Sequence, residues 1–249
     1  MTGERDWDGA TYDRIADPMS RWGGGVLERL PLTGDETVLD AGCGSGRVTE
    51  QLLERLPRGR VIAVDAAPSM LAEARRRLAR FGDRVRFVET DLGAPLPVDG
   101  PVDAILSTAT FHWVPDHDAL FRNLAAVLRP GGVLVAQCGG VGNVASVRRV
   151  LVELGETWPG PWTFATPEET AARLSGAGFV DVETWLQEEP TPIEPGAPME
   201  TFLATVILRA HLARMPEKER ASFVRRVAER LPRPEIDYVR LNIAARCAG

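Results

Sequence analysis

Short apolar runs and apolar residues at helical spacing alternate along the first half of the chain. Residues 37–40 begin with an apolar run, apolar side chains recur at helical spacing over residues 48–56, and a second run follows at residues 61–64. An apolar run of this length predicts a buried strand, and the helical spacing predicts a helix with one buried face. The order strand, helix, strand predicts an α/β fold with a parallel sheet.

The same alternation predicts the remaining elements. Further strands are expected at residues 85–89, 102–110, 133–137, 179–186 and 236–247. Helices are expected at residues 68–80, 118–128, 144–154, 167–176, 199–214 and 217–231, the fourth of them opened by a Thr166–Glu169 capping box. Four prolines and one glycine over residues 187–198 predict an irregular connection.

Together these elements predict a Rossmann-like α/β fold with helices on both faces of the sheet, built as a single domain from 249 residues. An N-terminal segment of one or two helices, interrupted by Pro18 and three glycines, is expected to lie across the mouth of the site as a lid. The expected parts are a lid at residues 1–31, a cofactor-binding core at 32–140, a substrate-side loop, helix and sixth strand at 141–198, a helical cap at 199–232 and a last strand at 233–249.

The first strand ends in a turn that contains a glycine at every second position. Gly42, Gly44 and Gly46 follow Asp40, and Asp65 ends the second strand. Glycines are needed where the backbone takes a positive φ or where a ligand approaches it closely. An acid at the tip of the second strand is the arrangement that binds an adenosine ribose. Arg47 stands where a nicotinamide fingerprint needs its third glycine, and no Lys-Ser or Lys-Thr pair follows for a P-loop.

Composition narrows the possible partners. The net charge is −6 and no basic block contains interleaved aromatic residues, so nucleic acid is not an expected partner. The three cysteines, Cys43, Cys138 and Cys247, lack metal-ligand spacing, so we expect reduced thiols and no metal site. The polar N-terminus and the short apolar runs predict a cytoplasmic protein without a membrane partner.

The segment from Asp40 to Gly46, with Asp65 on the next strand, resembles the first motif of class I S-adenosylmethionine-dependent methyltransferases. The resemblance implies seven strands with the last one antiparallel. It also implies that Asp65 and Ala66 bind the ribose side, that Asp91 and Leu92 frame the adenine, and that Ser107 offers its backbone near the methionine amine. Arg21 and Tyr12 are expected to close over the methionine carboxylate, since a guanidinium pairs well with that group. The expected product is S-adenosylhomocysteine.

Two further segments resemble the trans-aconitate methyltransferase branch of this superfamily. They are residues 111–121, which begin Phe-His-Trp-Val-Pro-Asp-His, and residues 128–137, which begin Leu-Arg-Pro-Gly-Gly. The family has a glutamine where this chain has His112, and its known member methylates a carboxylate of a small polyacid. The resemblance therefore implies a small-molecule acceptor.

The chemistry of the acceptor decides whether a base is needed. A carboxylate attacks an activated methyl group without one, whereas a hydroxyl or an enolisable carbon needs a base such as His112, His117 or His211. His112 follows the fourth strand, where the acceptor is expected. It could act as a base, donate a hydrogen bond to the substrate, or serve only in polar packing, and the sequence leaves these alternatives open. We expect His117 to be structural. The residues expected to bind the acceptor are Trp113, Trp158, Trp162, Phe164 and His211.

The favoured function is methyl transfer to a carboxyl or hydroxyl oxygen of a small molecule. Transfer to carbon, with His112 as base, is the alternative within the same class. A non-catalytic S-adenosylmethionine-binding regulatory module is the alternative outside it, and the helical cap and the aromatic loop argue against that one. A nicotinamide oxidoreductase is disfavoured by Arg47.

Overall fold

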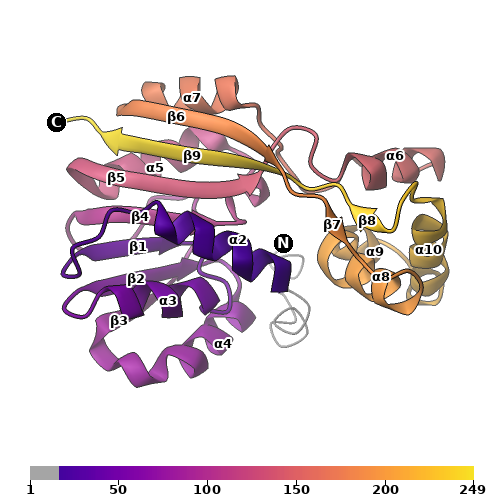
Figure 1. Cartoon of the computed structure of the whole chain (residues 1–249), viewed down its shortest axis with the longest axis horizontal. Helices are drawn as coiled ribbons and strands as arrows, with labels where there is room; N and C mark the ends of the chain where they lie inside the picture. Colours follow the sequence, from indigo (N-terminus) through magenta and orange to yellow (C-terminus); the bar gives the residue numbers. More distant parts are fainter. Residues whose placement is uncertain (1–16) are drawn as a thin grey trace.

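Seven strands form one twisted sheet in the computed structural model, which describes residues 17–249 (Figure 1). Their order across the sheet is β3-β2-β1-β4-β5-β9-β6, and all neighbours are parallel except that β9 runs antiparallel to β5 and to β6. The mostly parallel seven-stranded sheet with an antiparallel last strand is therefore confirmed. The strands are β1 (Thr37–Ala41), β2 (Arg60–Asp65), β3 (Val85–Glu89), β4 (Val102–Thr108), β5 (Leu128–Gly139), β6 (Phe179–Glu188) and β9 (Val239–Cys247).

Helices cover both faces of this sheet. Successive side chains of a strand point to opposite faces, so Val38 of β1 packs with the helices on one face and Leu39 with those on the other. The first face carries α2 (Asp17–Glu28), α3 (Arg47–Arg55) and α4 (Pro68–Leu78), and the second carries α5 (His117–Val127) and α7 (Pro167–Gly176). The capping box of Thr166 and Glu169 at the start of α7 is confirmed.

The glycines at 23–25 do not interrupt the N-terminal helix as expected, because α2 is continuous through them. A Cβ on Gly23 would lie 2.5 Å from Cγ2 of Val48 on α3, so the glycine allows the two helices to pack closely. Helix propensity alone disfavours glycine at this position, and the tertiary contact explains its presence.

A smaller helical lobe stands beside the open end of the sheet and has a hydrophobic core of its own (Figure 1). Its elements are α6 (Ala145–Glu153), β7 (Thr191–Pro192), α8 (Ala197–Phe202), a π-helical turn (Leu203–Ile207), α9 (Arg209–Ala213), α10 (Glu217–Arg230) and β8 (Glu235–Ile236). Val147 and Val150 of α6 pack in the same core as Phe223 of α10. The lobe thus draws its helices from two separate parts of the chain.

Two predicted elements are divided in the structure. The helix expected at residues 199–214 is split by the π-helical turn, where the amide of Leu208 donates to the carbonyl of Leu203 at 2.7 Å. The strand expected at residues 236–247 breaks at Asp237, because this residue anchors the start of α6. Its carboxylate accepts from the amide of Ser146 at 2.8 Å, and its carbonyl accepts from the amide of Val144 at 3.0 Å.

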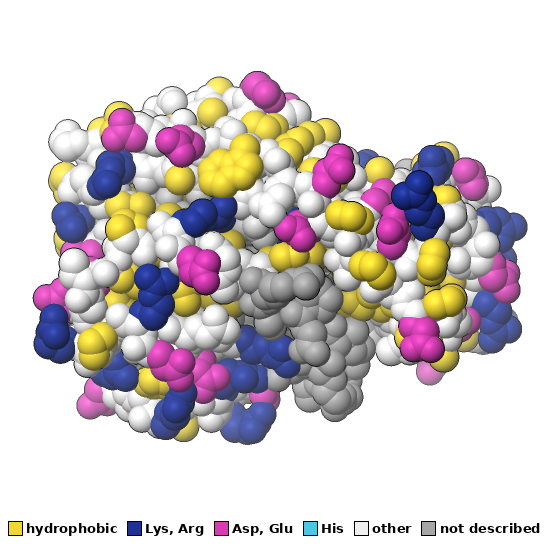
Figure 2. Space-filling view, in the orientation of Figure 1, with side chains coloured by type: hydrophobic (Ala, Val, Ile, Leu, Met, Phe, Trp, Pro, Cys, Tyr) yellow, Lys and Arg dark blue, Asp and Glu magenta, His cyan; other side chains and the backbone are white. Residues whose placement is uncertain are grey.

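Charged side chains of both signs are mixed over the face shown in Figure 2, and hydrophobic side chains gather over the outer strands β6 and β9. Val180, Trp185 and Leu186 are exposed apolar residues of β6. Within residues 17–249 no helix is long and apolar enough to cross a bilayer. In the same part of the chain, no three His, Cys, Asp or Glu side chains group as a metal ion would require.

Candidate active site

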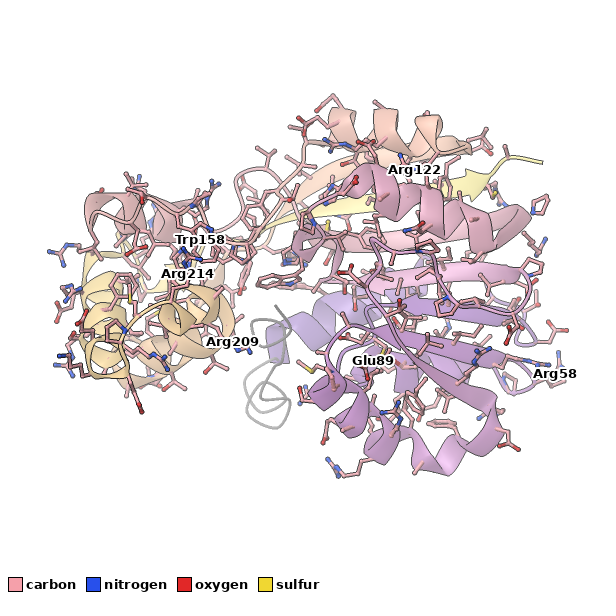
Figure 3. The ribbon with its side chains drawn as sticks, turned by 180° about the vertical axis from the view of Figure 1, so that it is seen from behind. Arg58, Glu89, Arg122, Trp158, Arg209 and Arg214 are labelled. Atoms are coloured by element: carbon pink, nitrogen blue, oxygen red, sulfur yellow. The ribbon has the colours of Figure 1, made fainter. Side chains whose placement is uncertain are left out.

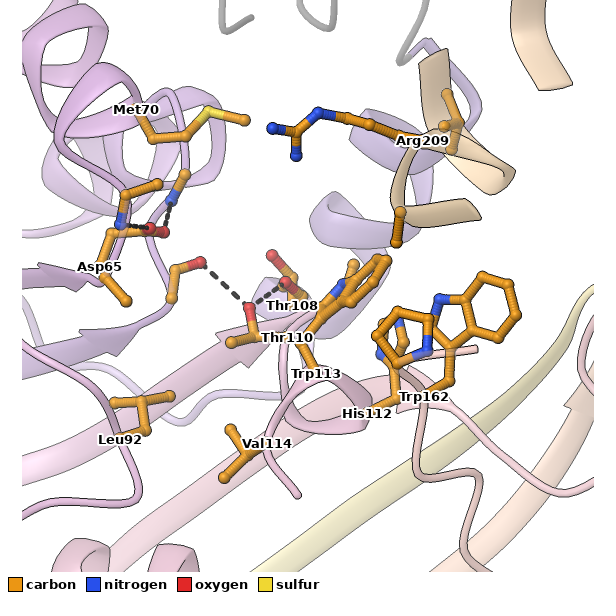
Figure 4. Close-up of a pocket in the computed structure, with 18 of the residues that line it drawn as sticks. Asp65, Met70, Leu92, Thr108, Thr110, His112, Trp113, Val114, Trp162 and Arg209 are labelled. Carbon is orange, nitrogen blue, oxygen red and sulfur yellow. Dashed lines mark hydrogen bonds between the residues drawn. The ribbon is translucent and has the colours of Figure 1, made fainter. Parts of the chain in front are cut away.

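A cavity of about 490 Å³ lies between the carboxyl ends of the parallel strands and the helical lobe. Ligands of open α/β sheets bind at this edge. We call the part lined by the glycine turn and by the residues after β2 and β3 the turn half. The part lined by the residues after β4, the 158–164 loop, the helical lobe and β9 is the cap half. Figure 4 shows Asp65 and Leu92 in the turn half, facing His112, Trp113 and Trp162 in the cap half.

The glycine turn leaves open space in the turn half. Gly42 and Gly44 have φ angles of +86° and +53°, and a Cβ built on Gly44 would meet no heavy atom within 4 Å. The amides of Gly42 and Cys43 both donate to the carbonyl of Val64 at 2.8 Å, which fixes the turn against β2. The hydroxyl of Thr110 donates to the carbonyl of Gly42 at 3.2 Å, in a space that a Cβ on Gly42 would fill. A ligand can therefore reach the backbone at Gly44.

Asp65 faces this space with a carboxylate held in place by backbone amides. It accepts from the amide of Gly44 at 2.9 Å through one oxygen and from the amide of Ala67 at 2.9 Å through the other (Figure 4). Burial raises the pKa of Asp65, and these amide bonds oppose the rise. Each carboxylate oxygen accepts more than one hydrogen bond, so the two oxygens retain acceptor capacity for a pair of ribose hydroxyls.

Ala66, Asp91 and Leu92 also line the turn half. One oxygen of Asp91 accepts from the amide of Gly93 at 2.9 Å, and Leu92 is buried beside it. An oriented carboxylate next to an apolar side chain fits a flat base that carries an amino group.

Three residues predicted for the cofactor do not line the cavity. Asp40 is buried and accepts from the hydroxyl of Thr49 at 2.6 Å, so it anchors α3. Gly46 takes a φ of +82° to begin α3, and its missing side chain makes room for Ala74 of α4. Ser107 donates its hydroxyl to the carbonyl of Ala41 at 2.6 Å. Neighbours in a strand point to opposite faces, and the residues after Ser107, Thr108 and Ala109, form the wall instead.

Two predicted cofactor residues stay predictions. Tyr12 lies outside the described residues, and for Arg21 only the backbone of α2 is described. Trp22, the next residue along α2, lines the cavity, and its indole N–H donates to Glu189 at 3.3 Å. The middle of α2 therefore reaches the site at Trp22.

The cap half has aromatic walls. His112, Trp113, Trp158, Trp162 and Phe164 all line it as predicted. The 158–164 loop is tied to the end of β4, because the amide of Thr163 donates to the carbonyl of His112 at 2.9 Å. The rings of Trp162 and Phe164 are stacked with 10° between their planes.

His211 was predicted to bind the acceptor, but it does not line the cavity. It is only 1% exposed and packs behind the aromatic wall, with ring centroids 4.8 Å from Trp158 and 5.7 Å from Trp162. Arg214 lies over the Trp158 ring at 4.5 Å (Figure 3). The aromatic residues of the 158–164 loop thus enclose His211 of α9.

Two arginines of the cap half were not among the predicted site residues. Arg240 of β9 is 3% exposed and lies 4.8 Å from the Trp22 ring, and Arg209 reaches from the helical lobe across the cavity toward Met70 (Figure 4). A charged residue inside the mostly apolar segment 239–245 was the available signal for Arg240, because a buried charge is rarely retained without a partner or a ligand. Nothing in the sequence distinguishes Arg209 from a solvent-exposed arginine.

Several known proteins are similar to this chain in sequence. Residues 38–132 match the family model described as a methyltransferase domain. The chain is 32% identical to the trans-aconitate 2-methyltransferase of Variovorax paradoxus, over 91% of each chain. It is 40% identical to that of Azoarcus sp., over 69% of this chain and 60% of the relative. The chain belongs to the trans-aconitate 2-methyltransferase family of S-adenosylmethionine-dependent methyltransferases.

Solved structures agree with this fold at low sequence identity. A Haemonchus contortus phosphoethanolamine N-methyltransferase in complex with S-adenosylhomocysteine superposes with a TM-score of 0.67 at 19% identity, over 97% of this chain and 57% of that one. The YcgJ protein of Bacillus subtilis superposes with a TM-score of 0.65 at 17% identity, over 92% and 99%. At these identities the likeness shows the methyltransferase fold alone.

The tautomer of His112 determines what this methyltransferase can do with it. Nδ1 of His112 accepts from the amide of Gly139 at 3.2 Å, so in the neutral ring Nε2 carries the proton. Burial, the positive charge of Arg240 and that of His117 hold the pKa of His112 well below its usual range. His112 is therefore a neutral hydrogen-bond donor whose ring lone pair is engaged by Gly139, so we expect it not to serve as a base.

We expect the activity to be independent of His112 titration. The kcat/KM for the acceptor should stay level from about pH 6.5 to 9, because the ring is already neutral below this range. His112→Gln keeps a side-chain N–H and should remain within about 5-fold of the parent, whereas His112→Ala should lose about 10-fold with the hydrogen bond. Stopped-time assays across the pH range provide the measurement. A rise of kcat/KM through one titration, together with a loss of about 100-fold or more in His112→Gln, would restore the base role.

Asp40 makes the stability of the protein depend on pH. Burial raises its pKa from 3.8 to about 7, a rise that the hydrogen bond from Thr49 opposes and the charge of Asp65 reinforces. Its stabilising contribution is thus complete below the unfolded pKa and is lost as the pH rises through the folded one. From pH 5 to pH 8 the free energy of unfolding should fall by roughly 2–3 kcal/mol from this group.

Asp40→Asn, which keeps an oxygen for Thr49, should remove that slope. Urea unfolding of the parent and of Asp40→Asn at pH 5 and pH 8 measures the change in the free energy of unfolding for each protein. Subtracting one change from the other removes the contributions of all other titrating groups. Parallel pH dependences in the two proteins would show that Asp40 does not titrate in this window.

Proposed function

We propose that this methyltransferase transfers the methyl group of S-adenosylmethionine to a carboxylate oxygen of a small acid. The sulfonium supplies an electrophilic methyl group. A carboxylate lone pair forms the new O–CH3 bond as the C–S bond breaks, the bonding pair returns to sulfur, and the products are a methyl ester and S-adenosylhomocysteine with no proton to remove. The protein then has to hold the two reactants in line and exclude water.

The observation that carries this proposal is the charge of the cap half. Arg209 and Arg240 line it, while the described residues that line this half include no Asp or Glu. A buried guanidinium with a planar fork of donors is suited to a carboxylate. The two acids among the described lining residues, Asp65 and Asp91, both belong to the turn half.

The histidines support a carboxylate over a hydroxyl or a carbon acceptor. Nδ1 of His112 is occupied by the Gly139 amide, and neither His117 nor His211 lines the cavity. No described histidine therefore offers a ring lone pair to the cap half. An acceptor that is already anionic needs none, so methyl transfer to carbon is the weaker proposal.

Within this proposal the turn half holds the cofactor. Asp65 binds the ribose hydroxyls, Asp91 and Leu92 frame the adenine, and Gly44 lets the cofactor approach the backbone. The open space at Gly44 and the oriented carboxylate of Asp65 support this assignment. The cap half provides a cavity for an acceptor, which favours an enzyme over a regulatory module that only binds the cofactor. The relatives' name, trans-aconitate 2-methyltransferase, supports a small carboxylic acid as acceptor.

The test is the chemistry of the product. The protein is incubated with S-adenosylmethionine carrying a labelled methyl group and with a panel of carboxylic acids, phenols and enolisable ketones. We expect label only in the acids, in a form released as methanol by mild alkali, because esters hydrolyse there and ethers or C-methyl groups do not. Alkali-stable label in a phenol or ketone would refute the carboxylate assignment.

A further inference from the structure

One buried polar side chain of the cavity wall has a hydrogen-bonding group that faces a ligand. Asn143 lies in the turn between β5 and α6, lines the cavity and is only 3% exposed. Its backbone amide donates to the carbonyl of Gly140 at 3.0 Å, so the turn fixes it just beyond the end of β5. Asn143 was not among the predicted site residues. Burying an amide is costly unless its polar groups find partners, so the partners of its two ends indicate its role.

The oxygen of the Asn143 side chain is engaged within the protein. It accepts from the amide of Val239 at 2.9 Å. A backbone amide can only donate, so this contact identifies the oxygen and places the NH2 group at the other end of the side chain. In the described part of the chain, residues 17–249, no group accepts from that NH2 group, which stays accessible at the cavity wall. Asn143 therefore offers N–H donors to a ligand.

The backbone beside Asn143 is held in an unusual conformation. Val144, the next residue, has a φ of +49° and a ψ of 35°, in the left-handed region that a β-branched residue rarely adopts. Its amide donates to the carbonyl of Asp237 at 3.0 Å, which keeps the strained residue in place. Strain of this kind persists where the surroundings enforce it and is concentrated at functional sites. This strained turn fixes Asn143 at the cavity.

Asn143 lies in the same wall as His112 and Arg240. The amide of Gly139 donates to Nδ1 of His112 at 3.2 Å, and a Cβ built on Gly139 would lie 2.9 Å from Nδ2 of Asn143. The missing side chain of Gly139 thus allows both groups to approach this strand end. Val239, which binds the oxygen of Asn143, directly precedes Arg240 on β9. The NH2 group of Asn143 therefore belongs to the cap half, where the acceptor is proposed to bind.

Resting on the proposed carboxyl methylation, we propose that Asn143 binds the acceptor, with its NH2 group donating a hydrogen bond to an oxygen of the acid. An amide N–H is directional and uncharged, so it selects an oxygen lone pair at this place over an apolar group or another donor. Arg240 attracts the carboxylate, and Asn143 determines which acids fit beside it. Asn143 is thus a specificity-determining residue of the acceptor site.

Two substitutions of Asn143 separate this role from a purely structural one. Asn143→Asp keeps an oxygen that accepts from Val239 but replaces the NH2 group by an anionic oxygen, whereas Asn143→Ala removes both groups. The acceptor is trans-aconitate, the acid in the relatives' name, or the acid of the panel above with a higher kcat/KM. We expect KM to rise about 10-fold in Asn143→Ala through the lost hydrogen bond, and about 100-fold or more in Asn143→Asp through repulsion of like charges. Both variants should keep the Kd of S-adenosylhomocysteine within 3-fold of the parent.

Asn242→Asp is the matched control for Asn143→Asp. Asn242 is fully buried on β9 without lining the cavity, and its oxygen accepts from Arg29 at 2.8 Å, so a charge there has a partner. This variant should keep KM within 3-fold of the parent.

The order of the two Asn143 variants decides the outcome. A KM in Asn143→Asp at or below that in Asn143→Ala would overturn the inference, because a residue that only fixes the turn tolerates Asp better than Ala. A parallel loss of S-adenosylhomocysteine affinity in both variants would overturn it as well. If the parent binds S-adenosylhomocysteine and methylates no acid of the panel, the proposed function itself fails and this inference with it.

Discussion

Replacing Arg240 with methionine is expected to lower kcat/KM for a carboxylic acid acceptor by about 30-fold or more. Methionine keeps much of the buried volume of a side chain that is 3% exposed, but it removes the charge that faces the acceptor. Loss of one partner of a buried charge pair costs about 2–5 kcal/mol, which corresponds to roughly 30- to 5000-fold. The loss should fall mainly on KM, because the carboxylate is bound before and during transfer.

Arg246→Met on the same strand is the matched control. Its side chain is half exposed and donates to the carbonyl of Gly131 at 3.3 Å, far from the cavity wall. Both variants should bind S-adenosylhomocysteine like the parent. An Arg240→Met protein that binds the cofactor product normally and methylates acids at the parental kcat/KM would refute the role of Arg240 in acceptor binding.

Replacing Asp65 with alanine is expected to weaken S-adenosylhomocysteine binding by about 2–4 kcal/mol, or roughly 30- to 1000-fold in Kd. In the proposed assignment the change removes two charge-assisted hydrogen bonds to the ribose, each stronger than a neutral one. It also frees the amides of Gly44 and Ala67, which now donate to this carboxylate. Calorimetric titration measures the effect, and thermal unfolding of the free protein shows how much of it comes from a loosened turn.

Asp99→Ala is the control for Asp65, because Asp99 is an exposed acid whose partner is Arg86, outside the cavity. It should bind S-adenosylhomocysteine like the parent. Unchanged affinity in Asp65→Ala would remove the ribose assignment, and a parallel loss in both variants would indicate a general effect of charge.

The sheet and the glycine turn could be predicted because their signals are local. A buried strand that ends in Asp40 and in glycines with positive φ needs no distant contact to be recognised, and the same holds for the capping box at Thr166. The helical lobe was harder to predict from the sequence. Periodicity shows that α6 is amphipathic, but not that its apolar face meets α10 instead of the sheet.

The errors in the site have two physical causes. Asp40 points into the protein because the side of the sheet that a residue faces depends on tertiary packing, so a motif locates the turn more securely than each of its side chains. Arg209 and Arg240 were missed for a different reason. Both line the cavity only in the folded chain, in which β9 with Arg240 lies between β5 and β6 and Arg209 begins α9 after the π-helical turn.

A crystal structure of the complex with S-adenosylhomocysteine and an acid acceptor tests the central claim most directly. We predict the ribose hydroxyls within hydrogen-bonding distance of the Asp65 carboxylate, the sulfur directed at the cap half, and the acceptor carboxylate beside Arg240. A cofactor whose ribose lies away from Asp65, or an acceptor whose carboxylate lies away from both Arg209 and Arg240, would contradict the account.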